Sequence, residues 1–192
     1  MQGMKYGSEQ HNRRSIRLSG YDYSRPGAYF ATICTQKRWC LFGSIVNGEM
    51  RLNDAGRIVQ EVWGELPARF PQVGIDNFIV MPNHIHGIIL VGAQFIAPSN
   101  SPPENPARDV IGHAPRVGEI IRAYKAMSTR EIRRTGKADF RWQRNYYEHI
   151  VRNEESLNRI QGYIVNNPSQ WDVDRENPAA ITPEPENAWR AR

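Results

Sequence analysis

The feature that most limits the fold is a pair of apolar runs on either side of Pro82-Asn83. Residues 73–80 precede this break and residues 84–91 follow it, and both runs are rich in β-branched side chains. Short apolar runs of this kind, bounded by a turn signal, are typical of strands. The sequence therefore predicts two strands here, or one strand that is interrupted at Pro82-Asn83.

Other elements are predicted from composition, spacing and capping residues. Asn47-Gly48 lies between two short apolar runs, which is the signal of a type I′ hairpin. Apolar side chains at helical spacing follow potential N-caps at Asn53 or Asp54 and at Asn153. The remaining predictions are strands at 27–36 and 141–151, a helix at 54–66, a helix at 117–134, and a last helix at 154–167 that Pro168 ends.

The order of these elements predicts an α+β fold. Strand, small hairpin, helix, two strands, helix, strand and helix is close to a ferredoxin-like pattern, with a central antiparallel sheet and helices on one face. A chain of 192 residues is rather short for two domains, so we expect one domain over residues 1–192. We expect a basic N-terminal arm (1–26), a mobile proline-rich insertion (92–116), and a C-terminal tail (169–192) that is either draped over the domain or disordered.

Composition limits the surroundings in which the protein works. No apolar run approaches the length that spans a bilayer, and the N-terminal residues lack the apolar stretch of a signal peptide. Cys34 and Cys40 are the only cysteines, and without a sign of export we expect both to be reduced thiols. These features predict a cytoplasmic protein with no membrane partner.

Positive charge is concentrated in one part of the chain. The net charge is +5, yet residues 116–144 alone contain nine basic and three acidic residues, an excess of six positive charges. Such a stretch is expected in a protein that contacts phosphates, although a solvated helix face is an alternative explanation. The charge pattern thus makes nucleic acid a plausible partner.

Two histidines stand in the second apolar run. Side chains alternate along a strand, so His84 and His86 project to one face while Ile85 enters the opposite one. Two imidazoles on one face can chelate one divalent ion. The alternative is that each histidine finds a separate hydrogen-bond partner in the core.

The last predicted helix brings a tyrosine and an asparagine together. Tyr163 and Asn167 are four residues apart and share a helix face, and Gly162 leaves room beside the tyrosine. A tyrosine near a metal is a suitable nucleophile for a phosphodiester, and an asparagine oxygen can bind the same ion. Tyr163 could also be an ordinary half-buried aromatic residue.

These motifs together resemble a known family. "MPNHIHGIIL" resembles the HUH motif of single-tyrosine HUH transposases, and "RWQRNYYEHIVRNEESLNRIQGYIVNNP" is similar to the corresponding block of REP-associated tyrosine transposases. The resemblance covers about residues 27–171. It implies an enzyme that requires Mg²⁺ or Mn²⁺, cleaves and rejoins single-stranded DNA beside hairpins such as REP-like palindromes, and passes through a 5′-phosphotyrosine intermediate.

The resemblance also implies roles for single residues. His84 and His86 match the metal ligands, and Tyr163 matches the nucleophile. Asn167 falls where relatives often have a glutamine that helps to hold the metal, and asparagine is one methylene shorter. Tyr146 and Tyr147 are rival nucleophiles, and His113 is an alternative third ligand or a free loop histidine.

Three aromatic residues, Tyr124, Trp142 and Tyr146, are interleaved with basic residues along the sequence. This pattern is found in proteins that stack on bases and hold phosphates, and core packing is the alternative explanation. The residues predicted to contact DNA are Arg122, Lys125, Arg133, Arg134, Arg144, Tyr146, Arg13 and Arg14. Two other functions are weighed: a non-catalytic protein that binds structured DNA or RNA, and a structural zinc site that uses Cys34 or Cys40 with the histidines. The sequence does not distinguish a monomer from a homodimer.

Overall fold

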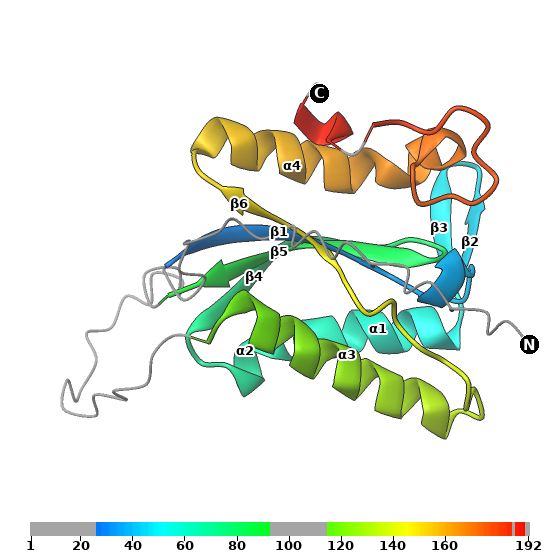
Figure 1. Cartoon of the computed structure of the whole chain (residues 1–192), viewed down its shortest axis with the longest axis horizontal. Coiled ribbons are helices and arrows are strands. Elements are labelled where there is room, and N and C mark those ends of the chain that lie inside the picture. Colours follow the sequence, from blue (N-terminus) through cyan, green and yellow to red (C-terminus); the bar gives the residue numbers. More distant parts are fainter. Residues whose placement is uncertain (1–25, 93–114, 186, 191–192) are drawn as a thin grey trace, which may run out of the picture.

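A four-stranded antiparallel sheet forms the centre of the computed structural model, which describes residues 26–92, 115–185 and 187–190 (Figure 1). Its strands are β1 (Gly27–Cys34), β4 (Val73–Val80), β5 (His84–Val91) and β6 (Tyr147–Val151), in the order β4-β5-β1-β6. A separate hairpin contains β2 (Gly43–Val46) and β3 (Glu49–Leu52). With the hairpin set aside, the strand order and the two crossover helices are those of a ferredoxin-like fold, so the predicted α+β class is confirmed.

The helices connect the strands and extend beyond them. They are α1 (Asp54–Gly64), α2 (Leu66–Arg69), α3 (Val117–Arg134) and α4 (Glu154–Asn166), with 3₁₀ turns η1 (Gln36–Arg38), η3 (Asn167–Val173) and η4 (Ala188–Arg190). None of the helices in the described ranges is long and apolar enough to cross a membrane.

Local sequence signals explain where several elements begin and turn. Asn47 and Gly48 have φ values of 53° and 76°, which is the left-handed pair that a type I′ turn requires. The side chain of Asn53 accepts a hydrogen bond from the backbone N–H of Gly56 at 3.0 Å, and that of Asn153 accepts one from Ser156 at 2.8 Å. Both asparagines are therefore N-caps, of α1 and of α4, as predicted.

The last strand is shorter than predicted. Residues 141–151 were expected to be one strand, but β6 begins at Tyr147. The ammonium of Lys125 accounts for the difference, since it donates to the carbonyl oxygens of Gln143, Arg144 and Asn145 at 2.9, 3.4 and 3.1 Å. Three successive carbonyls that converge on one cation cannot alternate in direction as they do in a strand.

The arrangement of helices corrects one part of the predicted fold. The crossover helices α1 and α3 do lie on one face of the sheet, but α4 lies on the opposite face (Figure 1). The physical reason is that both faces of β1 and β5 are apolar. Ile33, Ile85 and Ile89 pack against α1 and α3, whereas Phe30 and Ile88 pack against α4.

This second face is where the predicted site residues lie. His86 pairs with Thr32 across β5 and β1, on the same side as Phe30, while Ile85 is fully buried on the other side. The C-terminal segment covers part of this face, because Ala188 and Trp189 are buried against Phe30 and α4. The segment 169–190 is therefore draped over the fold in its described residues.

Some predictions fall outside the described residues. These are the N-terminal arm with Arg13 and Arg14, most of the proline-rich insertion, and His113. The assignment of residues 1–192 to one domain stays a prediction.

Candidate functional site

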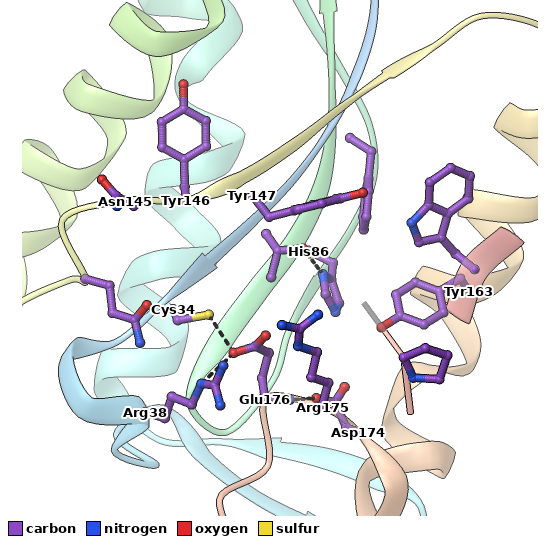
Figure 2. A pocket seen from close by; sticks show the side chains of 15 residues that line it. Cys34, Arg38, His86, Asn145, Tyr146, Tyr147, Tyr163, Asp174, Arg175 and Glu176 are labelled. Carbon is purple, nitrogen blue, oxygen red and sulfur yellow. Dashed lines mark hydrogen bonds and ion pairs between the residues drawn. The ribbon is translucent and has the colours of Figure 1, made fainter. Parts of the chain in front are cut away.

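A cavity of about 190 Å³ lies where β1, β5, β6, α4 and the C-terminal segment meet (Figure 2). His86 of β5 and Tyr163 of α4 both face it, and Asp174 and Arg175 enter from the C-terminal segment. Tyr147 of β6 lines it as well. The structure thus gathers around one space residues from both ends of the described chain, from Phe30 of β1 to Trp189.

The two histidines lie close enough to share one ion. Nε2 of His84 and Nε2 of His86 are 3.0 Å apart, and both side chains are almost fully buried. Thr32 of the neighbouring strand holds the other nitrogen of His86, with its Oγ1 2.9 Å from Nδ1. Each ring is therefore fixed through its Nδ1 side, which leaves the two Nε2 atoms facing each other.

Asn83 determines which nitrogen of His84 carries the proton. The Asn83 amide donates to the backbone oxygens of Arg38 and Glu176 at 3.0 and 2.6 Å, so its NH₂ group is identified by two acceptors. The amide oxygen is then the atom that lies 2.8 Å from His84 Nδ1. Because that oxygen can only accept, His84 Nδ1 is protonated and Nε2 presents a lone pair.

Burial keeps the histidines neutral. It lowers the pKa of His84 to about 3, and the nearby Arg38 guanidinium acts in the same direction. Burial also lowers the pKa of His86 well below its usual range, with His84 adding to the effect and Asp174 opposing it. Neutral imidazole is the form that binds metal ions.

Asp174 completes a group of three potential ligands. Its Oδ2 is 3.9 Å from Nε2 of His84, and one ligand atom from each of His84, His86 and Asp174 lies within 4.8 Å of the others. Asp174 is only 1% exposed, and its Oδ2 has no hydrogen-bond partner among the described residues. An isolated buried carboxylate oxygen is costly. A divalent cation would compensate it, so the residues present fit a divalent metal.

Tyr163 lies directly beside this group. Its ring is 5.2 Å from the ring of His86 between centroids, at an interplanar angle of 60°. The side chain is 8% exposed and its hydroxyl donates to Oε1 of Glu184 at 3.1 Å. Gly162 does not make room for it, because a Cβ at Gly162 would meet nothing within 4 Å.

Asn167 is buried at the junction of α4 and η3. Neither atom of its side-chain amide has a hydrogen-bond partner in the described part of the chain, although the residue is fully buried. Two unsatisfied amide atoms at such a position call for a ligand or partner outside the described residues. A role for Asn167 in metal binding stays a prediction.

The rival tyrosines differ in their surroundings. Tyr147 faces the cavity and its hydroxyl donates to Oδ1 of Asn187 at 2.8 Å. Tyr146 points the other way in Figure 2, and the ammonium of Lys125 lies 5.4 Å from the centre of its ring. Tyr163 is the tyrosine that contacts the ring of a candidate ligand.

The predicted basic residues do not all gather at the cavity. Arg122, Arg133 and Arg134 are exposed on α3, which lies across the sheet from α4 (Figure 1). Arg134 pairs with Glu131, and Arg133 donates to the backbone oxygen of Phe140. Lys125 is occupied by three carbonyls, while Arg144 is exposed in the loop beside the cavity. Burial lowers the pKa of Lys125 to about 8.

Several residues at the site have no signal in the sequence. Arg38, Arg175 and Asp174 line the cavity, and Glu184 accepts the hydrogen bond of the Tyr163 hydroxyl. Asp174, Arg175 and Glu184 belong to the C-terminal segment, which has no periodic pattern that would predict its path. Arg38 follows β1, and only the pairing of β1 with β5 brings it near His84.

The cysteines do not form a zinc site with the histidines in the described structure. Cys34 is buried and its thiol donates to Oε2 of Glu176 at 3.3 Å, whereas Cys40 is exposed. Burial raises the pKa of Cys34 far above its usual range, and Glu176 adds to this effect. Neither cysteine belongs to the described group of potential ligands, which contains Asp174 with the histidines.

A solved structure shares this architecture. The REP-associated tyrosine transposase bound to a REP hairpin superposes with a TM-score of 0.51, over 80% of this chain and 74% of that chain, at 19% sequence identity. At this identity the likeness shows the fold: the chain has the α+β fold of a tyrosine transposase.

A sequence relative shows the family. The chain is 45% identical over 173 residues to an uncharacterized protein of Haemophilus influenzae. The matched region spans 89% of this chain and 96% of that protein. The chain therefore belongs to the same family as this Haemophilus influenzae protein. No family model matches the sequence.

Proposed function

We propose that this protein is a metal-dependent endonuclease and strand transferase of single-stranded DNA, which acts beside hairpins through a covalent 5′-phosphotyrosine intermediate. The observation that carries the proposal is the position of Tyr163. Its ring contacts His86, and both residues face the same cavity as Asp174. A nucleophile beside a candidate metal site is the arrangement that phosphodiester transesterification requires.

His84, His86 and Asp174 would hold the ion, and Asn167 is a fourth candidate ligand. We expect Mn²⁺ or Mg²⁺, and the two imidazole nitrogens favour Mn²⁺, because Mg²⁺ prefers oxygen ligands. When bound, the ion supplies Lewis-acid polarisation of the scissile phosphate.

The protein's own residues account for the rest of the reaction. The Tyr163 hydroxyl attacks phosphorus, and the bond from phosphorus to the 3′ oxygen breaks. The 5′ end of one DNA segment then remains on the tyrosine, while the other segment ends in a free 3′-OH. The guanidinium groups of Arg38 and Arg175 line the cavity and are placed to bind the phosphate before and after this step.

Hairpin DNA is the proposed substrate because the solved neighbour is bound to a REP hairpin. Tyr146 and Arg144 are the proposed DNA contacts nearest the cavity. Arg122, Arg133 and Arg134 on α3 would meet only DNA that passes around the edge of the sheet. Arg13 and Arg14 remain proposed contacts of the N-terminal arm. Monomer and homodimer are both compatible with the proposal.

Covalent trapping tests the proposal. Hairpin oligonucleotides with randomised single-stranded flanks are labelled at the 3′ end and incubated with the protein and Mn²⁺ or Mg²⁺. With the 3′ label we expect a labelled protein band in a denaturing gel. With a 5′ label we expect a shorter labelled DNA fragment that is free of protein. Tyr163→Phe should abolish the labelled band, and His84→Ala should reduce it strongly. Tyr147→Phe is the matched control and should retain it.

The controls separate this function from its alternatives. An adduct that persists in Tyr163→Phe and disappears in Tyr147→Phe would assign the nucleophile to Tyr147. Salt-dependent hairpin binding without cleavage in either ion would instead indicate a non-catalytic binding protein.

A further inference from the structure

The C-terminal segment brings a carboxylate to the hydroxyl of the proposed nucleophile. Tyr163 donates its hydroxyl hydrogen to Oε1 of Glu184 at 3.1 Å. Tyr163 belongs to α4 and is buried against Phe30, whereas Glu184 lies 21 residues further along the chain and is half-buried. The contact thus joins α4 to the C-terminal segment.

The position of Glu184 is set by its backbone and by the residues that follow it. Its N–H donates to the carbonyl oxygen of Val173 at 2.8 Å, which ties the segment to the end of η3. Beyond it, Ala188 and Trp189 are buried against the α4 face of the sheet. The segment is therefore anchored on both sides of Glu184, so the carboxylate does not depend on a free loop for its place.

The other carboxylates near the cavity have different partners. Asp174 belongs to the group of candidate metal ligands, and Glu176 forms an ion pair with Arg38 at 2.8 Å and accepts from Cys34. Glu184 is the carboxylate whose hydrogen bond to the Tyr163 hydroxyl the structure records.

We propose that Glu184 is the general base of the reaction, and this inference rests on the proposed function. A phenol is a weak nucleophile while it keeps its proton, and a base within hydrogen-bond reach of the nucleophile is the usual remedy. Because a carboxylate is too weak to remove the proton beforehand, transfer accompanies the formation of the new bond.

The proposed step is balanced in atoms and charge. Glu184 takes the proton of the Tyr163 hydroxyl as the tyrosine oxygen bonds to phosphorus. The bond between phosphorus and the 3′ oxygen breaks, and the 3′ oxygen leaves with its electron pair and takes a proton from water. In the rejoining step a 3′-OH attacks phosphorus and gives its proton back to water. The bond between phosphorus and the tyrosine oxygen breaks, and the tyrosine oxygen recovers its proton from Glu184.

Glu184→Gln tests this role with little change in shape. Glutamine keeps an oxygen that accepts from Tyr163, so it preserves the orientation of the hydroxyl but cannot take its proton. The single-turnover rate of adduct formation is measured in Mn²⁺ at saturating protein, with a 3′-labelled hairpin that the wild type cleaves. General bases contribute about 10²- to 10⁴-fold, and we expect losses in this range for both Glu184→Gln and Glu184→Ala.

Two further measurements identify a merely structural effect. Hairpin affinity and melting temperature should stay at wild-type values in Glu184→Gln, and Glu184→Asp should recover part of the rate. Glu155→Gln is the control, since Glu155 is exposed on the first turn of α4 and pairs with Arg159. Its rate should equal that of the wild type.

The outcomes separate this inference from the proposed function. If the wild type forms an adduct and Glu184→Gln reacts within twofold of it, or faster, Glu184 is not the base while the proposed function stands. If Glu184→Ala is slow but Glu184→Gln is not, the residue only orients the tyrosine. If the wild type forms no adduct in either ion, both proposals fail.

Discussion

Thr32 is the residue through which β1 controls the candidate metal site. Its hydroxyl lies 2.9 Å from Nδ1 of His86, and outer partners of this kind typically change metal affinity 10- to 100-fold when they are removed. We expect Thr32→Val to weaken Mn²⁺ binding by roughly that factor, as measured by isothermal titration calorimetry. Thr129→Val, on α3 across the sheet, should leave the affinity unchanged. Equal affinities in the two variants would show that the Thr32 contact does not orient His86.

His149 connects the C-terminal segment to β6 in a pH-dependent way. Its ring lies 4.4 Å from that of Trp189, and burial lowers its pKa to about 4, with Arg190 and Arg152 acting in the same direction. His149 therefore binds a proton more readily in the unfolded chain than in the folded one. Its protonation in the unfolded chain lowers the free energy of unfolding progressively as the pH falls from 6.5 toward 4, and has no such effect above pH 6.5.

His149→Phe should remove this acid sensitivity. Between pH 7 and pH 5, the free energy of unfolding of the wild type should fall by about 1 kcal/mol more than that of the variant, after allowance for partial exposure. Urea titrations at the two pH values measure the difference. Parallel losses in both proteins would assign the acid sensitivity to other groups.

At the scale of elements, two glycines differ in how much space surrounds them, one on β5 and one on α4. A Cβ at Gly87 would lie 2.4 Å from Cζ2 of Trp63, a ring that is fully buried and stacked on Phe78 at 4.7 Å. A Cβ at Gly162, exposed on α4, would meet nothing within 4 Å.

Alanine at the two positions should therefore have opposite effects. Gly87→Ala should lower the free energy of unfolding by about 1–3 kcal/mol through overpacking. Gly162→Ala should raise it by about 0.5–1 kcal/mol, because alanine favours the helix. Equilibrium unfolding in urea measures both changes. A neutral Gly87→Ala would mean that Trp63 can move aside.

The positions of helices and strands along the chain are more predictable from the sequence than the face of the sheet that each helix covers. Caps and turns such as Asn53, Asn153 and Asn47-Gly48 act on neighbouring residues, so the sequence contains their whole cause. The face that α4 covers depends on contacts of Phe30 and Ile88 with residues far along the chain, and this non-local pairing misled the prediction of helices on one face.

In the candidate site, too, residues placed by local geometry are predictable and residues placed by long-range contacts are not. His84 and His86 share a face through strand alternation, and Tyr163 and Asn167 follow from helix geometry and the family resemblance. Asp174 and Glu184 belong to a segment without periodicity, whose path is set by long-range contacts such as that of Trp189 with Phe30.

For the whole molecule, a metal held between β5 and the C-terminal segment should stabilise the folded chain. Mn²⁺ at about 100 times its dissociation constant should add about 2.7 kcal/mol, because it binds only the native state. A thermal melt should show this as a higher melting temperature that EDTA reverses. In Asp174→Asn, Mn²⁺ should raise the melting temperature much less. Asp172→Asn on the same segment is the control and should keep the full rise. An equal shift in Asp174→Asn would place the ion elsewhere.

The central claim is that Tyr163 becomes covalently attached to DNA, and peptide mapping of the trapped adduct tests it most directly. Trypsin cleavage after Arg159 and Arg175 gives a peptide, residues 160–175, in which Tyr163 is the sole tyrosine. Cleavage after Arg144 and Arg152 puts Tyr146 and Tyr147 in a different peptide, residues 145–152. After nuclease digestion, mass spectrometry should find the nucleotide remnant on peptide 160–175. A remnant on peptide 145–152, or none on either peptide, would contradict the account.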